Sequence, residues 1–417
     1  MNILKKILSV TISCLLYTAL TFGQTSKIDS TNTRLVRINP DKASGTTVSQ
    51  LFDEVKFIPL ETTKESVFGK ISKLDFVDNH FIIFDADTYS VLIFTNNGKF
   101  TGKIDAGKMA KQNDVNDLTT KFGGFKIVKV LGENLIQIEK GNYDLYFNLN
   151  ANFVKKQPAT KRLENSPSSI TNSDYAYKLN WVDKSDKEDL VYKIAFFKKD
   201  SIYAKFLPLN SIKHRGDYLP NGNRENSDNF QSRYFITNDY ALDIFEVRPP
   251  GLQLAYKISM PIKNVLPKNF MEDPKYFGYL KRNNFFKENP DVIYALRNIS
   301  QFYDQLWFQL SSSKETRSFI YNLKTNGFFN IKNIEPDQLS SYLPITDEGA
   351  TFNFANYGIL LHKDQYIYNS IPSLAMFIFK DQNTNKQVIY PEALDNYFKT
   401  ENRKSNPVIV QLRPKQN

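Results

Sequence analysis

The sequence predicts an all-β fold, a six-bladed β-propeller of four-stranded antiparallel blades with short helical insertions. Three observations lead to this fold class. The 417-residue chain is rich in aromatic residues, with 33 Phe and 23 Tyr, and such chains favour β-structure. Short apolar runs recur between turn signals at nearly constant spacing. Several runs are apolar throughout, which indicates strands buried on both faces, as in a sheet packed between two other sheets.

The clearest unit predicts a four-stranded antiparallel meander. Its middle strands are expected at FIIF (81–84) and SVLIF (90–94), on either side of the turn DADT. The Asn-Gly pair that follows predicts a tight hairpin into KFTGKI (99–104), because both turn positions require positive φ. KISKLDFV (70–77) supplies the remaining strand, before the turn DN.

Five further units follow the first. The second, at 125–157, keeps nearly the same spacing between comparable strands, and the later copies are less regular. Units of this size cannot bury their own faces, so they indicate a closed ring in which neighbours cover each other. The later copies are predicted at 177–209, 233–259, 303–331 and 350–369.

The propeller domain is predicted to span residues 51–417. EVKFIPLE (54–61) is expected to add an N-terminal strand to the last blade and so close the ring. Helices that begin near proline are expected within 263–292 and 389–403. Residues 24–50 are expected to form a loosely ordered leader.

Residues 1–23 have the three-part layout of a secretory signal peptide. Two lysines precede an apolar run that ends at Phe22, and this run is short for a membrane span. Cleavage is predicted between Gly23 and Gln24. The alternative is an uncleaved membrane anchor, but no cluster of charged residues directly follows the run.

The single cysteine, Cys14, lies inside the apolar run. A lipoprotein would need its cysteine at the end of that run, so plain secretion is favoured and lipidation of Cys14 is the alternative. After cleavage the mature chain would contain no cysteine and could form neither a disulfide nor a thiolate metal site. We therefore expect an exported protein of the periplasm or cell surface, without a membrane span after removal of the signal.

The formal net charge is +10. The basic residues are scattered in pairs such as Lys155-Lys156 and Lys198-Lys199, and no RNA-binding motif collects them. A solvated basic surface that can attract anionic polymers is the favoured interpretation, and nucleic acid is not expected as a partner.

No metal or cofactor site is predicted. The three histidines, His80, His214 and His362, are dispersed in the sequence, whereas a zinc site requires converging ligands. Asp85 and Asp87 of DADT could face a calcium ion, but the further ligands of a calcium loop are missing. A tight turn in which the aspartate accepts hydrogen bonds from the backbone is favoured.

The densest group of titratable residues is in the long polar loop 214–230. His214, Arg215 and Asp217 of HRGD are the candidate ligand-binding residues, with a solvated loop as the alternative. Four aromatic residues could line a sugar-binding face, although most are expected to pack between blades. They are Trp181, Trp307, Tyr234 and Tyr256.

Three motifs of the chain are specific: PLETT (59–63), FTNNGKF (94–100) and NPVIVQL (406–412). In these motifs, and over roughly 51–414, the chain resembles the exported six-bladed β-propeller proteins of Bacteroidetes-type bacteria. Members commonly carry a GxGPGE-like loop after the first blade, where this chain reads IDAGKMAKQNDVNDLTT (104–120). The resemblance implies the fold and export; it implies no reaction, so no catalytic residue transfers.

Two functions stay open at this point. The first is a non-enzymatic binding or scaffold module, expected to be monomeric, for an envelope or extracellular ligand such as a glycan, peptide or protein. The second is a hydrolase or lyase with a site at the ring axis built from several blades. A cluster of acids and histidines at the axis would favour the enzyme, and a polar or aromatic surface without one would favour binding.

Overall fold

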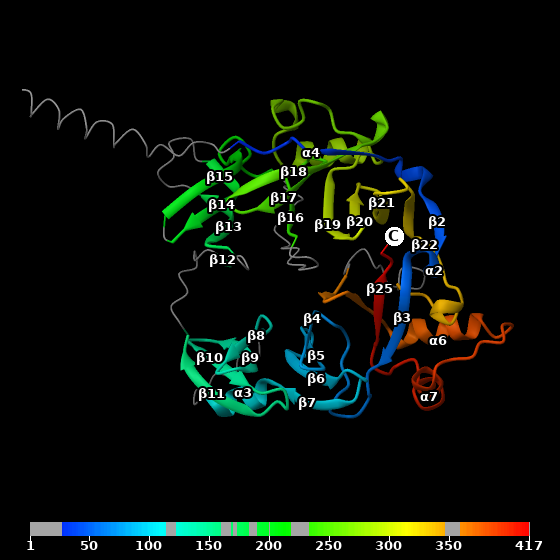
Figure 1. The fold of residues 1–417 in the computed structure, drawn as a ribbon. Helices are drawn as coiled ribbons and strands as arrows, with labels where there is room; N and C mark the ends of the chain where they lie inside the picture. Colours follow the sequence, from blue (N-terminus) through cyan, green and yellow to red (C-terminus); the bar gives the residue numbers. More distant parts are fainter. Residues whose placement is uncertain are drawn as a thin grey trace, which may run out of the picture.

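The computed structural model has six small sheets arranged around a ring (Figure 1). It describes residues 27–113, 122–159, 168–169, 173–182, 190–199, 201–217, 233–346 and 359–416. The predicted six-bladed β-propeller is therefore confirmed. The signal peptide and its cleavage point at Gly23 and Gln24 lie outside the described residues.

The first three blades follow the chain in order, and every neighbouring pair of strands is antiparallel. Blade 1 contains β4 (Lys73–Val77), β5 (His80–Asp85), β6 (Ser90–Thr95) and β7 (Phe100–Ile104). Blade 2 contains β8 (Lys126–Val130), β9 (Glu133–Lys140), β10 (Tyr143–Phe147) and β11 (Phe153–Pro158). Blade 3 contains β12 (Ser168–Ser169), β13 (Tyr175–Val182), β14 (Leu190–Lys198) and β15 (Ser201–Asn210).

The last three blades each include a strand from the N-terminal part of the chain. Blade 4 contains β16 (Phe235–Thr237), β17 (Asp243–Arg248), β18 (Gly251–Ser259) and β1 (Arg34–Arg37). Blade 5 contains β19 (Ala295–Phe302), β20 (Gln305–Ser311), β21 (Thr316–Asn322), β22 (Phe328–Glu335) and β2 (Ser44–Thr47). Blade 6 contains β23 (Leu361–Lys363), β24 (Tyr366–Ile371), β25 (Val408–Pro414) and β3 (Phe52–Pro59).

The N-terminal segment 27–59 forms a strap along three successive blades (Figure 1). β1 pairs in parallel with β18, β2 pairs in parallel with β22, and β3 pairs antiparallel with β25. The expected closure of the last blade by an N-terminal strand is confirmed. The expectation that residues 24–50 form a loosely ordered leader is wrong for β1 and β2, because these strands satisfy the open hydrogen-bonding edges of blades 4 and 5.

Apolar clusters fill five of the six junctions between blades in the part of the chain that the structure describes. Junctions 6–1 and 1–2 are filled from both sheets, as are junctions 3–4, 4–5 and 5–6. In blade 1, for example, Ile82 and Ile93 face blade 2 while Phe81 and Leu92 face blade 6. Burial on both sides explains why these strands are apolar throughout. Among the described residues, no such cluster joins blades 2 and 3.

The helices lie in the connections between strands. The predicted helical insertions are η3 (Ile262–Asn264), η4 (Pro274–Tyr276), α4 (Tyr279–Glu288) and α7 (Glu392–Thr400). The sequence patterns did not identify α3 (Ala106–Asn113) or α6 (Ser373–Gln382). The remaining short helices are η1 (Pro40–Lys42), α2 (Val48–Leu51) and η5 (Gln338–Ser340). Met376 of α6 and Leu394 of α7 are buried against blade 6, so these helices cover the outside of the ring there.

Candidate functional site

The candidate residues of the HRGD segment lie in a turn directly after β15. His214 is buried and its Nδ1 lies 2.9 Å from Oδ2 of Asp217. The two residues are three positions apart, which brings their side chains together in a tight turn. Arg215 lies between them and is exposed. The structure therefore joins His214 and Asp217 but leaves Arg215 outside the pair.

Arg282 of α4 completes this group. Its NH2 lies 2.8 Å from Oδ2 of Asp217, and both side chains are fully buried. The other carboxylate oxygen of Asp217 accepts a hydrogen bond from the backbone N–H of Gly278. The guanidinium also lies 4.5 Å from the ring centre of Tyr240 and 4.7 Å from that of Phe270.

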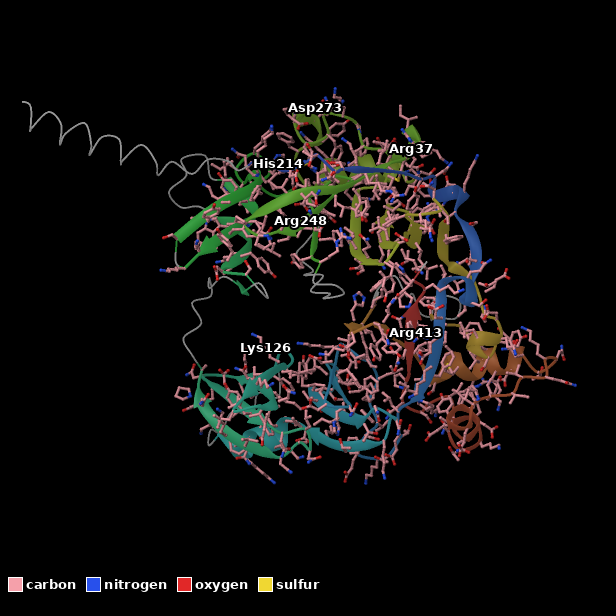
Figure 2. The ribbon with its side chains drawn as sticks, in the orientation of Figure 1. Arg37, Lys126, His214, Arg248, Asp273 and Arg413 are labelled. Atoms are coloured by element: carbon pink, nitrogen blue, oxygen red, sulfur yellow. The ribbon has the colours of Figure 1, made fainter. Side chains whose placement is uncertain are left out.

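The group attaches the 262–292 insertion to the end of blade 3. The ring of His214 packs edge-on against Phe277 of the same insertion, with centroids 5.2 Å apart (Figure 2 labels His214). Burial raises the pKa of the Tyr240 hydroxyl, so this tyrosine stays neutral beside the ion pair. Both oxygens of Asp217 are used in contacts within the protein. These contacts connect the insertion to blade 3. Because His214 and Asp217 are buried, the solvated-loop alternative is wrong for them.

The DADT motif also makes structural contacts. Asp85 Oδ1 accepts a hydrogen bond from the backbone N–H of Asp87, 3.1 Å away, and Oδ2 accepts one from the hydroxyl of Thr88, 2.8 Å away. This is the turn that the sequence favoured over a calcium loop.

In the described part of the chain, no group of three or more His, Cys, Asp or Glu residues is placed to hold a metal ion. Nor does any helix there have the length and apolarity needed to cross a membrane.

The four aromatic candidates divide between core and surface. Trp307 and Tyr256 are buried in the clusters of junctions 5–6 and 4–5, and Tyr234 packs at junction 3–4. Trp181 of β13 is half-buried on the other face of blade 3. Its ring lies 5.1 Å from that of Phe197. Only Trp181 of the four therefore lies on a face that none of the apolar clusters in the described structure covers.

That face of blade 3 carries a row of lysines. Lys178 of β13 and Lys205 of β15 both pair with Ala195 of β14, so the three side chains share one face. Nζ of Lys178 lies 4.8 Å from the ring centre of Trp181, and Nζ of Lys205 lies 4.4 Å from that of Tyr192. The opposite face of the sheet, with Ile194 and Phe196, packs on blade 4. The lysine row therefore faces blade 2.

Blade 2 carries a matching row that crosses all four strands. Its members are Lys126, Gln137, Tyr146 and Lys155, each paired with the next. Nζ of Lys155 lies 4.7 Å from the ring centre of Tyr146. The opposite face, with Ile136 and Leu145, packs on blade 1, so this row faces blade 3. Figure 2 shows Lys126 at the side of blade 2 that is nearer to blade 3.

We call these two rows together the lysine junction: Lys126, Gln137, Tyr146 and Lys155 on blade 2, and Lys178, Ala195 and Lys205 on blade 3. The rings below the ammonium groups are buried, with exposed fractions of 9% for Tyr146 and 3% for Tyr192. Lys155, Lys178 and Lys205 are half-buried, and Lys126 is exposed. Burial lowers the pKa of Lys178, while the electron-rich ring faces favour the charged ammonium.

The local environment includes acids as well as lysines. Lys126 forms an ion pair of 3.2 Å with Glu139, and Asp144 is buried opposite Glu139 on the same face. On the other side of blade 3, Lys193 lies 3.5 Å from Asp239 of blade 4. The sequence showed the paired lysines but not their common face, because the shared face depends on the register of three or four strands.

A family model described as 6-bladed beta-propeller matches residues 24–108. This match includes the strap and all of blade 1. The protein is a six-bladed β-propeller. The predicted resemblance is confirmed, and the matched region contains two of the three motifs, PLETT and FTNNGKF, on which it was based.

Comparison with a solved structure from Bacteroides fragilis supports the same fold for the propeller. A crystal structure from Bacteroides fragilis, described as that of a candidate exported protein, has a TM-score of 0.58 and 14% identity, and covers 92% of this chain and 100% of that chain. A member of the DUF4221 family from Bacteroides vulgatus has a TM-score of 0.42 and 9% identity, and covers 88% of this chain and 97% of that chain. No curated protein matches the chain. At 14% identity the likeness to the Bacteroides fragilis protein concerns the fold alone.

Proposed function

We propose that this propeller is an exported binding module whose ligand contacts the lysine junction between blades 2 and 3. The observation that carries the proposal is the contrast between this junction and the other five. Those five are filled by apolar side chains, whereas in the described residues the facing sides of blades 2 and 3 carry lysines supported by aromatic rings. Ammonium groups on both sides of the junction attract a ligand that carries negative groups.

Export is supported by the N-terminal sequence. Lysines, a short apolar run and small residues before Gln24 are the features that a signal peptidase requires. The similar protein from Bacteroides fragilis is also described as exported. Mass spectrometry of the protein purified from its native envelope should give a chain that starts at Gln24. A chain acylated at Cys14 would contradict this part of the proposal.

The hydrolase or lyase alternative has less support. His214 and Asp217, the densest titratable group of the sequence, form a buried contact with Arg282 far from the ring axis (Figure 2). His362 lies on β23 and is buried against Phe302, with centroids 4.5 Å apart. Both histidines therefore make contacts within the protein. The described residues agree better with a binding role than with a hydrolase or lyase.

Lysine footprinting tests the binding proposal. The mature chain would be methylated with formaldehyde and a borane reductant, with and without a soluble extract of the native envelope, and each lysine read by peptide mass spectrometry. We expect protection of Lys155, Lys178 and Lys205. Lys156 and Lys198 should not be protected, because they lie on the opposite faces of the same blades. Equal modification with and without extract would contradict the proposal, and turnover of a protected component would favour the enzyme.

A further inference from the structure

We propose that the ligand of the lysine junction is an acidic glycan, a chain whose sugars carry carboxylate or sulfate groups. This inference rests on the proposed function and specifies the chemistry of the ligand. The carboxylate or sulfate oxygens accept hydrogen bonds from the ammonium groups of Lys155, Lys178 and Lys205, and Lys126 lies at the inner end of the blade 2 row.

The aromatic rings hold the lysines in place. The Lys155 ammonium lies over the ring of Tyr146, its direct partner on the neighbouring strand, and the Lys205 ammonium lies over Tyr192. A cation over a ring is attracted by the ring's negative face, so less side-chain freedom is lost when an anion binds. The rings are buried, whereas the lysines above them keep access to solvent. The junction therefore presents ordered donors for anions.

The same geometry argues against ligands that need open ring faces. Neutral sugars and nucleic-acid bases bind proteins largely by stacking on exposed aromatic rings. Here lysine ammonium groups lie over the rings of Tyr146, Tyr192 and Trp181 at distances of 4.4–4.8 Å. A ligand that uses negative groups and does not need stacking fits this arrangement better than one that depends on its bases.

The direct test uses an oligogalacturonate labelled with a fluorophore, and its fully methyl-esterified form as a control with the same sugars and no charge. Fluorescence anisotropy with the mature wild-type chain should show saturable binding of the acid form only. Affinity should decrease strongly between low and physiological salt, because screening weakens contacts between exposed charges. Equal binding of the two forms, or no binding of the acid form, would overturn the inference.

Two double variants locate the site. Lys155→Met/Lys205→Met removes one ammonium from each row and keeps most of the side-chain length. Lys156→Met/Lys198→Met is the matched control, since these lysines also lie over tyrosines, Tyr143 at 4.6 Å and Tyr175 at 5.5 Å, but on the opposite faces. We expect the first variant to weaken binding about tenfold or more and the control to change it less than about twofold. Similar losses in both would overturn the inference.

Two further measurements keep the outcome clear. If the first variant does not fold, footprinting of the wild-type lysines with oligogalacturonate replaces it; protection of Lys155 and Lys205 would support the inference and unchanged modification would overturn it. A twelve-residue oligothymidylate that binds the same site more tightly than the glycan would also overturn it. If the envelope extract protects these lysines while oligogalacturonate does not, the acidic-glycan inference fails and the proposed binding function stands.

Discussion

The side chain of Asn406 joins the two ends of the propeller by hydrogen bonds to the backbone of Glu61, 345 positions earlier in the chain. Its Nδ2 donates to the carbonyl oxygens of Glu61 at 2.8 Å and Ser66 at 3.0 Å, and its Oδ1 accepts from the N–H of Phe68 at 3.1 Å. The side chain is fully buried. β3 and β25 pair as neighbours, and Asn406 fixes the loop that follows β3. This contact explains why the chain contains both PLETT and NPVIVQL, although they lie at opposite ends of the propeller sequence.

Asn406→Ala should destabilise the propeller strongly. The change removes three hydrogen bonds and deprives the carbonyl of Ser66 and the N–H of Phe68 of this partner, while the carbonyl of Glu61 keeps its bond from the Ser66 hydroxyl. We therefore expect a loss of about 3 kcal/mol in the free energy of unfolding. Urea unfolding followed by tryptophan fluorescence would measure it. Asn383→Ala is the control, because buried Asn383 donates a single side-chain hydrogen bond, to the carbonyl of Tyr342 at 2.6 Å. The prediction fails if the two variants lose the same stability.

Gly98→Ala should be much more harmful than another glycine substitution in a hairpin. Gly98 ends the NNG turn with φ +81°, and a Cβ there would lie 1.9 Å from the carbonyl oxygen of Pro59 in β3. Gly132 has φ +93° with no atom within 4 Å of the added Cβ. Gly132→Ala should therefore cost about 1 kcal/mol for the backbone conformation alone. Gly98→Ala should cost several times more, because blade 1 and the closing strand must separate.

Thermal unfolding of the two glycine variants measures the difference directly. The comparison isolates the contact with Pro59, since both positions have a positive φ that alanine rarely adopts. Equal melting temperatures for the two variants would mean that the turn of blade 1 does not limit how closely β3 approaches.

Substitution of Asp217 tests the structural interpretation of the HRGD segment. Asp217→Ala leaves the buried guanidinium of Arg282 without its carboxylate, and we expect a loss of about 3–5 kcal/mol in unfolding free energy. Arg215→Met, at the exposed position between His214 and Asp217, should change stability by less than about 0.5 kcal/mol. The measurement is urea unfolding of each variant beside the wild type. A small effect of Asp217→Ala would mean that the insertion is not held by this ion pair.

The fold could be predicted from the sequence because its signals are local. The strands of blades 1 and 2 follow from apolar runs and from turns such as the one closed by Asp85. The strap strands β1 and β2 could not be predicted, because RLVR and SGTT have no buried periodicity of their own and pair with edges more than 200 residues away.

The candidate site was predicted less well for a related reason. His214 and Asp217 stood out as a dense titratable group, but their partner Arg282 lies in another insertion with no motif that connects them. Lys155 was visible only as one member of a lysine pair. Its common face with Lys126 depends on the pairing of β8 to β11, and a shift of one residue would have turned it toward blade 1.

His362 should make the propeller less stable as the pH decreases. Burial lowers the pKa of this histidine from 6.5 to about 3, so below pH 6.5 the unfolded chain takes up a proton that the folded chain does not. Folding stability is therefore unaffected by this group above about pH 7 and decreases by up to about 1.4 kcal/mol per pH unit between pH 6 and pH 4. His362→Leu should remove this part of the acid dependence, measured as unfolding free energy in urea at several pH values. His80→Gln, at the start of β5, is the control, because it also removes a histidine and leaves the acid dependence due to His362 in place. If His362→Leu and the wild type lose stability in parallel on acidification, His362 does not contribute to the acid sensitivity of the fold.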